Sequence, residues 1–224
     1  MRGEPLQFYM IKEQNSHLEK IMDRLPQEVQ ENILLSLTEP DDLFRACSTS
    51  RVSRNICSGS AFWREKFRRE NLPLLQEGYT LTAWMAIYKK AFQAAREADR
   101  LVGSGEKIEI RVSEIFDLRH LGFYVDSSVR AVWQAEREGD NFATYDYVDD
   151  EGQEHQVRVH DDYYLVFSPS SGLYIMAMVN YQVTIDNEEE TVSNLSVETR
   201  FTLKLTTKDM WYVVYRMAFF GYHF

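Results

Sequence analysis

Acidic residues and histidines in the second half of the chain are the first side chains whose types suggest chemistry. One candidate is a calcium-binding loop, because three acids precede a glycine: Asp149, Asp150 and Glu151 before Gly152. In an EF-hand loop the glycine occupies position six, which would put Tyr147 at position one, where an acidic ligand is required. The spacing therefore excludes an EF-hand and favours a solvated hairpin tip.

A second candidate site contains His155 and His160, which lie close to Asp161 and Asp162. Side chains alternate between the two faces of a strand, so an offset of five residues places the two histidines on opposite faces. The sequence also lacks a glycine-rich phosphate loop, a nucleophile elbow and a His-Glu-x-x-His run. We therefore expect no metal site, no cofactor, no catalytic residue and no enzyme activity.

The two cysteines, Cys47 and Cys57, are too few for a disulfide scaffold. They stand ten residues apart in one helical region, and no partner ligand lies at zinc spacing on either side. We expect two buried thiols rather than a disulfide bridge.

The formal net charge of −10 is unevenly distributed along the 224 residues. Residues 1–105 contain 15 Lys and Arg against 14 Asp and Glu, whereas residues 106–224 contain 10 against 21. An acidic second half argues against nucleic acid as a partner, because contact with its backbone requires lysines and arginines. The strongest acidic stretch, residues 136–162, is compatible either with plain solubility or with the steering of a basic partner.

One local stretch is basic. Six basic residues accompany a single acid, Glu65, and we interpret them as the solvated faces of two helices. The six are Arg51, Arg54, Arg64, Lys66, Arg68 and Arg69.

No apolar run approaches the roughly 18 residues needed to span a bilayer. The N-terminus also lacks the basic and then apolar pattern of a signal peptide. We expect no membrane contact and a soluble protein of the cytoplasm or nucleus, in a host cell if the chain is viral.

Apolar residues recur at helical spacing in the first half of the chain. Pro26 suits a helix start, and Val29, Ile33 and Leu37 follow at intervals of four to form one apolar stripe. Three further short helices follow, and a longer stripe predicts a helix over about residues 81–101. Helices this short are unstable alone, so they must pack on one another or on a partner.

Several landmarks in this region occur in the order of a known motif. They are Leu25-Pro26-x-Glu28-Val29, Ile33-Leu34, Leu37, Asp42-Leu43, Cys47, Arg51-Val52 and Phe62-Trp63. This pattern resembles the F-box family over residues 22–70. The following Ala83-Trp84-x-x-x-Tyr88 resembles the F-box-like proteins of large DNA viruses, and it extends the resemblance loosely to residue 92.

The resemblance implies a docking function. F-box helices bind a Skp-type adaptor, which links them to a cullin–RING ubiquitin ligase, and a box this small leaves apolar side chains for a partner. The corresponding adaptor-binding positions are Leu25, Pro26, Val29, Ile33, Leu34, Leu43, Val52 and Trp63. Packing inside the domain is the alternative for each, and Val52 and Trp63 are assigned as contact or core positions.

The second half alternates apolar and polar residues, which predicts antiparallel strands. Alternation is clearest over residues 175–185 and 195–207, which flank a polar turn at 186–190. The other predicted strands are 107–112, 129–135, 143–148, 153–159, 163–167 and 211–219, with a short helix at 113–121. We expect one apolar, covered face and one mixed, wet face.

These patterns predict an α+β protein, in which a helical F-box-like bundle and a long helix precede an antiparallel β-meander, curved into a half-barrel or a sandwich. Two glycines in residues 101–105 mark the boundary between the halves. We expect an N-terminal extension (1–21), an F-box-like domain (22–70), a linker helix region (71–105) and a β-rich partner-binding domain (106–224).

The expected function is that of a substrate-recognition adaptor of a cullin–RING ubiquitin ligase. The F-box would bind the Skp-type adaptor, and the β domain would bind a target protein. Two alternatives stay open. One is an interaction or structural protein, such as a virion component, that keeps the F-box-like fold without a ligase. The other is a β domain that binds a small ligand, which a polar cavity with converging titratable groups would favour.

Overall fold

The computed structural model describes residues 25–122, 127–138, 142–148, 152–186, 189–193 and 201–224. The predicted extension at 1–21 and the hairpin tip Asp149–Glu151 lie outside these residues. The chain divides between Ala95 and Arg96 into two compact units, which we call unit 1 and unit 2. This division falls inside a helix, upstream of the boundary that the glycines at residues 101–105 predict.

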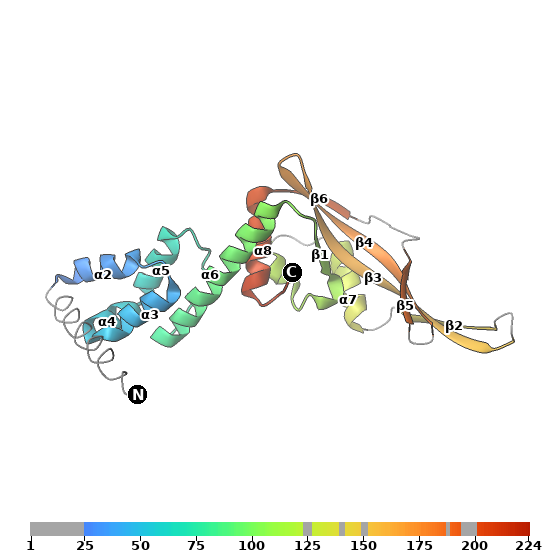
Figure 1. The fold of residues 1–224 in the computed structure, drawn as a ribbon, viewed down its shortest axis with the longest axis horizontal. Coiled ribbons are helices and arrows are strands. Elements are labelled where there is room, and N and C mark those ends of the chain that lie inside the picture. The colour runs from blue at the N-terminus through green and yellow to red at the C-terminus, as the bar shows by residue number, and fades with distance from the viewer. Residues whose placement is uncertain (1–24, 123–126, 139–141, 149–151, 187–188, 194–200) are drawn as a thin grey trace, which may run out of the picture. The chain divides into compact units, whose positions relative to one another are not determined.

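Unit 1 contains the predicted series of short helices (Figure 1). They are α2 (Gln27–Ser36), α3 (Pro40–Thr49), α4 (Arg51–Ser58) and α5 (Ser60–Arg69), followed by the long helix α6 (Leu81–Ser104). Pro26 is the N-cap of α2, and the Ser50 hydroxyl caps α4 by accepting the Ser53 N–H at 3.0 Å. Gly59 ends α4 and precedes α5 directly, so these two helices connect without a loop.

An aromatic cluster forms the core of unit 1. Trp63 of α5 stacks on Trp84 of α6 with 5.9 Å between the ring centroids. The centroid of the Tyr88 ring lies 5.7 Å from that of Trp63. The Trp63 indole N–H donates to the Cys57 carbonyl at 2.6 Å, which satisfies its polar atom in the interior. The beginning of α6 is therefore part of the core of the helical unit.

The two cysteines form a disulfide bond, so the prediction of free thiols is wrong. Cys47 of α3 and Cys57 of α4 are both fully buried, and their Cα atoms lie 5.8 Å apart, within the range of a disulfide. The sharp turn between α3 and α4 at Ser50 turns the two helices back on each other. The spacing of ten residues along the sequence did not reveal that the two cysteines approach each other, because they lie in two separate helices.

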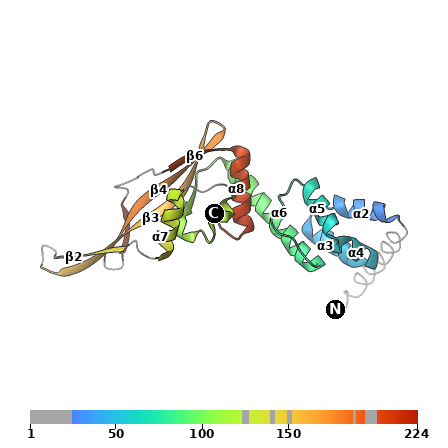
Figure 2. The ribbon, with the colours of Figure 1, turned by 180° about the vertical axis from the view of Figure 1, so that it is seen from behind.

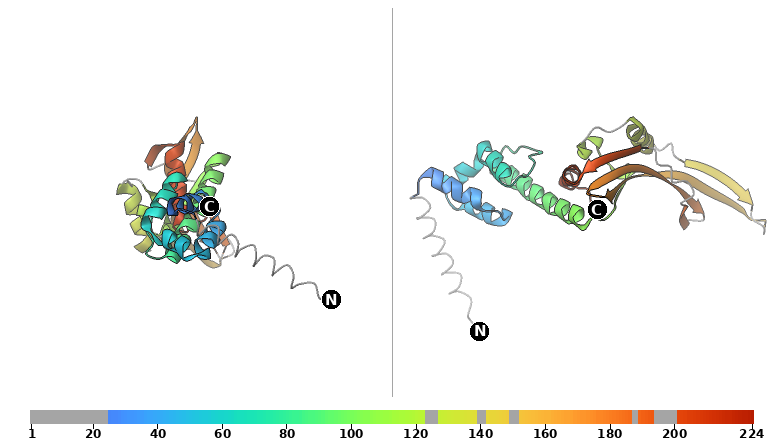
Figure 3. Two further views of the ribbon diagram at one scale, coloured as in Figure 1. Left: turned by 90° about the vertical axis from the view of Figure 1, so that its left-hand side faces the viewer. Right: turned by 90° about the horizontal axis from the view of Figure 1, so that it is seen from above.

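Unit 2 contains an open antiparallel sheet of six strands in its described part. They are β1 (Ile108–Arg111), β2 (Phe142–Val148), β3 (Glu154–Ser170), β4 (Leu173–Asp186), β5 (Glu189–Ser193) and β6 (Phe201–Thr206). The long strands β3 and β4 form the centre. β1 and β2 share the outer edge of β3, whereas β5 and β6 share the outer edge of β4. The sheet curves along its length and does not close (Figure 3).

The α+β class and most of the predicted strands are confirmed. The predicted strands at 153–159 and 163–167 are parts of the single strand β3, which turns into β4 at Ser171 and Gly172. The predicted short helix at 113–121 consists of two 3₁₀ turns, η1 (Val112–Glu114) and η2 (Leu118–Leu121). The predicted strand at 195–207 is described from Phe201 onward, as β6.

Two predicted strands are helices instead. Residues 129–135 lie in α7 (Ser127–Glu138), which is labelled in Figure 2. The Trp133 indole N–H of α7 donates to the Ile115 carbonyl at 2.7 Å and so joins this helix to the segment after β1. Residues 211–219 lie in α8 (Thr207–Phe219), which packs on β4 and β6. Both runs are apolar enough to satisfy either period, and tertiary packing decides for the helix: α8 packs on the sheet, and α7 packs on η1.

Candidate functional site

The predicted docking residues separate into an exposed group and a buried group. Leu34, Leu43 and Trp63 are fully buried inside unit 1. Pro26, Val29, Ile33 and Val52 are exposed, and Leu25 is half-buried. In the isolated protein the buried group holds the helices together, and only the exposed group is available to a partner.

Three exposed residues lie along one face of α2. Pro26, Val29 and Ile33 are spaced by three and four residues, which places them on the same side of the helix. The opposite face contains Leu34 and Leu35, which are buried. We call Pro26, Val29 and Ile33 the α2 strip. It is an apolar surface on a helix whose other face is anchored in the core.

Phe44 and Val52 also expose apolar side chains on unit 1. The exposed fractions of Val29, Ile33, Phe44 and Val52 lie between 37% and 45%. In α3 the neighbouring apolar residues Leu43 and Cys47 are buried, whereas Phe44 is on the surface. The apolar residues of α3 thus divide between interior and surface.

Lys66 holds the C-terminal end of α2 in place. This lysine is fully buried, so its assignment to a solvated helix face is wrong. Its ammonium donates to the Leu35 carbonyl at 3.1 Å and to the Leu37 carbonyl, and it lies 2.5 Å from a carboxylate oxygen of Glu70. A positive charge at this position complements the partial negative charge of the helix end. The α2 strip is therefore supported by an internal ion pair.

Tyr88 extends this network to the loop after α2. Its hydroxyl contacts the Thr38 carbonyl at 2.9 Å and Glu70 Oε2 at 2.7 Å. Burial, assisted by the neighbouring Glu70 carboxylate, raises the pKa of Tyr88 above its usual value. The hydroxyl therefore stays protonated and acts as a structural donor.

Three further basic residues of this region form ion pairs at the surface. Arg68 and Arg69 both bind Glu65, at 2.7 and 2.8 Å, and these hydrogen bonds lower the Glu65 pKa from 4.5 to about 2. Arg64 pairs with Glu77 at 2.7 Å. The basic stretch is therefore partly neutralised by its own acids.

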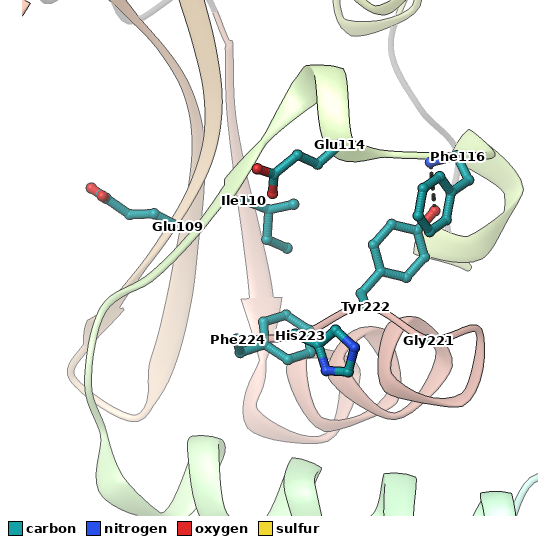
Figure 4. Close-up of a pocket in the computed structure, with 8 residues that line it drawn as sticks. All are labelled: Glu109, Ile110, Glu114, Phe116, Gly221, Tyr222, His223 and Phe224. Carbon is teal, nitrogen blue, oxygen red and sulfur yellow. Dashed lines mark hydrogen bonds between the residues drawn. The ribbon is translucent and has the colours of Figure 1, made fainter. Parts of the chain in front are cut away.

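A cavity of about 240 Å³ lies in unit 2 (Figure 4). Its wall combines Ile110 and the three aromatic rings of Phe116, Tyr222 and Phe224 with Glu114. In Figure 4 the carboxylates of Glu109 and Glu114 point in different directions and the ring of His223 lies apart from both, so these titratable groups do not converge. This arrangement lacks the polar geometry that we expected of a small-ligand site.

Among the described residues, no group of three His, Cys, Asp or Glu side chains is placed to hold a metal ion. In the same part of the chain, none of the helices is both long and apolar enough to cross a membrane.

Comparison with known proteins adds one match. A family model described as F-box-like matches residues 22–69, which include α2 to α5. No curated protein and no solved structure matches the chain. F-box-like domains are typically interaction modules for protein partners such as Skp-type adaptors. The matched residues 22–69 coincide with the helices that form the α2 strip and its buried support, and this segment is similar to F-box-like domains.

Proposed function

We propose that the protein is a substrate-recognition adaptor of a cullin–RING ubiquitin ligase. Unit 1 docks on a Skp-type adaptor, and unit 2 binds a target protein. The observation that carries this proposal is the α2 strip, an exposed apolar surface on a domain that matches the F-box-like family. Side chains of this kind gain free energy when a partner removes them from water.

The mechanism is proximity rather than bond chemistry. An adaptor that holds a target beside a ubiquitin-charged enzyme raises the effective concentration of the target's lysines. Such a protein needs two binding surfaces and no catalytic group. The F-box-like helices supply the first surface, and we assign the second to unit 2.

The eight predicted docking residues take two roles in this proposal. Pro26, Val29, Ile33 and Val52 contact the adaptor together with the half-buried Leu25. Leu34, Leu43 and Trp63 fix the positions of the helices from inside. Substitution of the first group therefore removes binding from a folded domain, whereas substitution of the second group unfolds it.

A pull-down with purified components tests the proposal. The full chain is immobilised and offered a Skp-type adaptor, alone and bound to a cullin. We expect capture by the wild-type chain and loss of capture by the double variant Val29→Asp/Ile33→Asp. Two charges at the centre of an apolar contact each leave an unpaired, desolvated carboxylate, so the expected loss exceeds about a hundredfold.

The matched control is Asn55→Asp/Gln93→Asp, which adds the same charge at exposed positions of α4 and α6. It should bind as the wild type does. Capture that survives the α2 strip variant, or no capture by the wild type, would refute the ligase adaptor and leave an interaction protein without a ligase. Circular dichroism of both variants confirms that unit 1 remains folded.

A further inference from the structure

The outer edge of β1 is open to a further strand. β1 pairs with β3 alone among the described strands. In an antiparallel ladder, alternate residues direct their backbone N–H and C=O groups to opposite sides. The side of β1 away from β3 therefore presents backbone donors and acceptors that no described strand uses.

The cavity of about 240 Å³ lies at this edge. Glu109 and Ile110 both line it, although consecutive strand residues direct their side chains to opposite faces. A cavity that touches both residues therefore reaches the edge of the strand. Figure 4 shows β1 on one side of it and the segment Gly221–Phe224 on the other.

The floor of the cavity is held by hydrogen bonds. The Tyr222 hydroxyl accepts the Phe116 N–H at 2.8 Å and the Asp117 N–H at 3.3 Å, and it lies 3.1 Å from Nδ1 of His120. Gly221 adopts a φ of +92° after Phe220, the C-cap of α8, and this turns the chain so that Tyr222 reaches its position. The cavity is thus formed before any ligand arrives.

The walls remain exposed although they are aromatic. Phe116 exposes 65% of its surface and Phe224 exposes 37%, and both residues line the same cavity. Drug-sized ligands occupy pockets of about 300–1,000 Å³, so a cavity of about 240 Å³ suits one large side chain. The rings therefore match an apolar side chain of a peptide better than a free small molecule.

The charge around the cavity selects a basic peptide. The exposed Glu114 directs its carboxylate toward the cavity in Figure 4. Residues 106–224 contain 21 Asp and Glu against 10 Lys and Arg, so unit 2 as a whole carries the net negative charge that attracts a basic segment. A basic side chain on the same face as the buried one stands two positions away from it in an extended peptide.

We propose that unit 2 binds an extended segment of a target protein along the edge of β1. The segment adds a strand to the sheet, places one apolar side chain in the cavity and places a Lys or Arg two residues away beside Glu114. Such strand addition takes affinity from backbone hydrogen bonds and specificity from the pockets for alternate side chains. This inference rests on the proposed function, because it names the kind of target segment that unit 2 recognises.

Binding of defined peptides to the full chain tests this inference. The probe is fluorescein-labelled Thr-Lys-Thr-Phe-Thr-Lys-Thr, followed by fluorescence anisotropy and by amide hydrogen exchange of β1. The matched peptides replace Phe by Ser, replace both Lys by Glu, or carry N-methyl groups at alternate backbone positions. We expect binding of the first peptide, slower exchange of β1 amides, and at least about tenfold weaker binding of each matched peptide.

Two variants and one control locate the contact on the protein. Phe116→Ser removes an exposed wall of the cavity, and Glu114→Lys reverses the charge beside it; each should weaken binding at least about tenfold. The control is Glu154→Lys, an exposed acid that pairs with Val148 at the other end of β3. It makes the same charge change and should alter binding by less than about twofold.

Equal binding of the Phe and Ser peptides, binding unaffected by Phe116→Ser, or no binding at all would overturn the inference. Self-association of the chain through β1, seen by sedimentation and abolished by the same variants, would also overturn it, because a second copy would be the occupant. Failure of this inference can be distinguished from failure of the ligase proposal. Phe116→Ser should still capture the Skp-type adaptor, and Val29→Asp/Ile33→Asp should still bind the peptide.

Discussion

The two units build a binding surface in opposite ways. Unit 1 consists of helices of ten residues or fewer plus part of α6, and no such helix is stable alone. Its order comes from the aromatic cluster around Trp63, the Cys47–Cys57 bond and the buried ammonium of Lys66. Unit 2 takes its order from the backbone ladder between β3 and β4, which extends over Val157–Ser170 and Leu173–Asp186.

This difference determines what each unit can offer to a partner. A helix uses its own backbone groups internally, so the α2 strip presents side chains only. A strand at the edge of a sheet leaves backbone groups open, so β1 presents main-chain donors and acceptors beside a cavity. We infer that unit 1 suits one partner of fixed shape, whereas unit 2 suits extended segments of varied sequence.

The largest expected effect separates the cores of the two units. Trp63→Ala removes the ring that contacts Trp84 and Tyr88, and a buried Trp→Ala change costs about 3–5 kcal/mol. We expect the amides of α2 to α5 to lose protection from hydrogen exchange, whereas those of β3 and β4 keep it. Loss of protection in both units together would show that they fold as one cooperative body.

Reduction should weaken unit 1 alone. The chain has no cysteine besides Cys47 and Cys57, so a thiol reductant acts only on the bond between α3 and α4. A bond with a sequence separation of 10 stabilises by about 2.5–3 kcal/mol in the chain-entropy description. Urea unfolding with and without reductant measures this loss in the wild type. The control is Cys47→Ala/Cys57→Ala, because this variant should not respond to the reductant.

The sequence predicted the elements of unit 1 better than their contacts. The helix start at Pro26, the stripe of Val29 and Ile33 and the helical spacing after it located α2 to α5, because helix periodicity and capping are local properties. The same stripe could not tell that Leu34 lies inside and Val29 outside, since that depends on which side of α2 faces the other helices. The approach of Cys47 to Cys57 was missed for the same reason.

In unit 2 most strands were predicted, but β5 (Glu189–Ser193), which begins inside the predicted polar turn at 186–190, and the covering helix α8 were not. Trp211, Val213 and Tyr215 alternate as a strand would, but Val214 between them is equally apolar and buried. A local signal was present, since Thr206 and Asp209 have the spacing of a capping box, and both bonds of that box form. The cavity joins residues 109–116 with residues 221–224, a contact between distant segments that no local pattern encodes.

A smaller effect is expected from an ion pair in unit 2. Asp162 of β3 is almost fully buried, and Arg111 of β1 binds both of its carboxylate oxygens, at 2.7 and 2.5 Å. Arg111→Gln leaves the carboxylate without its charged partner, which costs about 1–3 kcal/mol. We expect faster exchange of β1 amides with unit 1 unchanged, and Arg111→Lys should recover part of the loss. An unchanged β1 would mean that the backbone ladder alone holds the edge strand.

The smallest expected effect is a loss of stability of unit 2 at low pH. The Arg119 guanidinium and the Arg119 backbone N–H both bind Asp117, and they lower its pKa from 3.8 to about 2. The lowered pKa means that the Asp117 carboxyl binds a proton less tightly in the folded state than in the unfolded state. Its stabilisation of the folded state is therefore complete above about pH 4 and is lost as the pH falls toward 2. The Asp117–Arg119 ion pair is partly exposed, so it contributes less than about 1 kcal/mol to the free energy of unfolding. Urea unfolding of wild type and Asp117→Asn between pH 2 and 6 should show a difference that shrinks with acid. A difference that stays constant would show that Asp117 acts as the side-chain cap of η2 rather than through its charge.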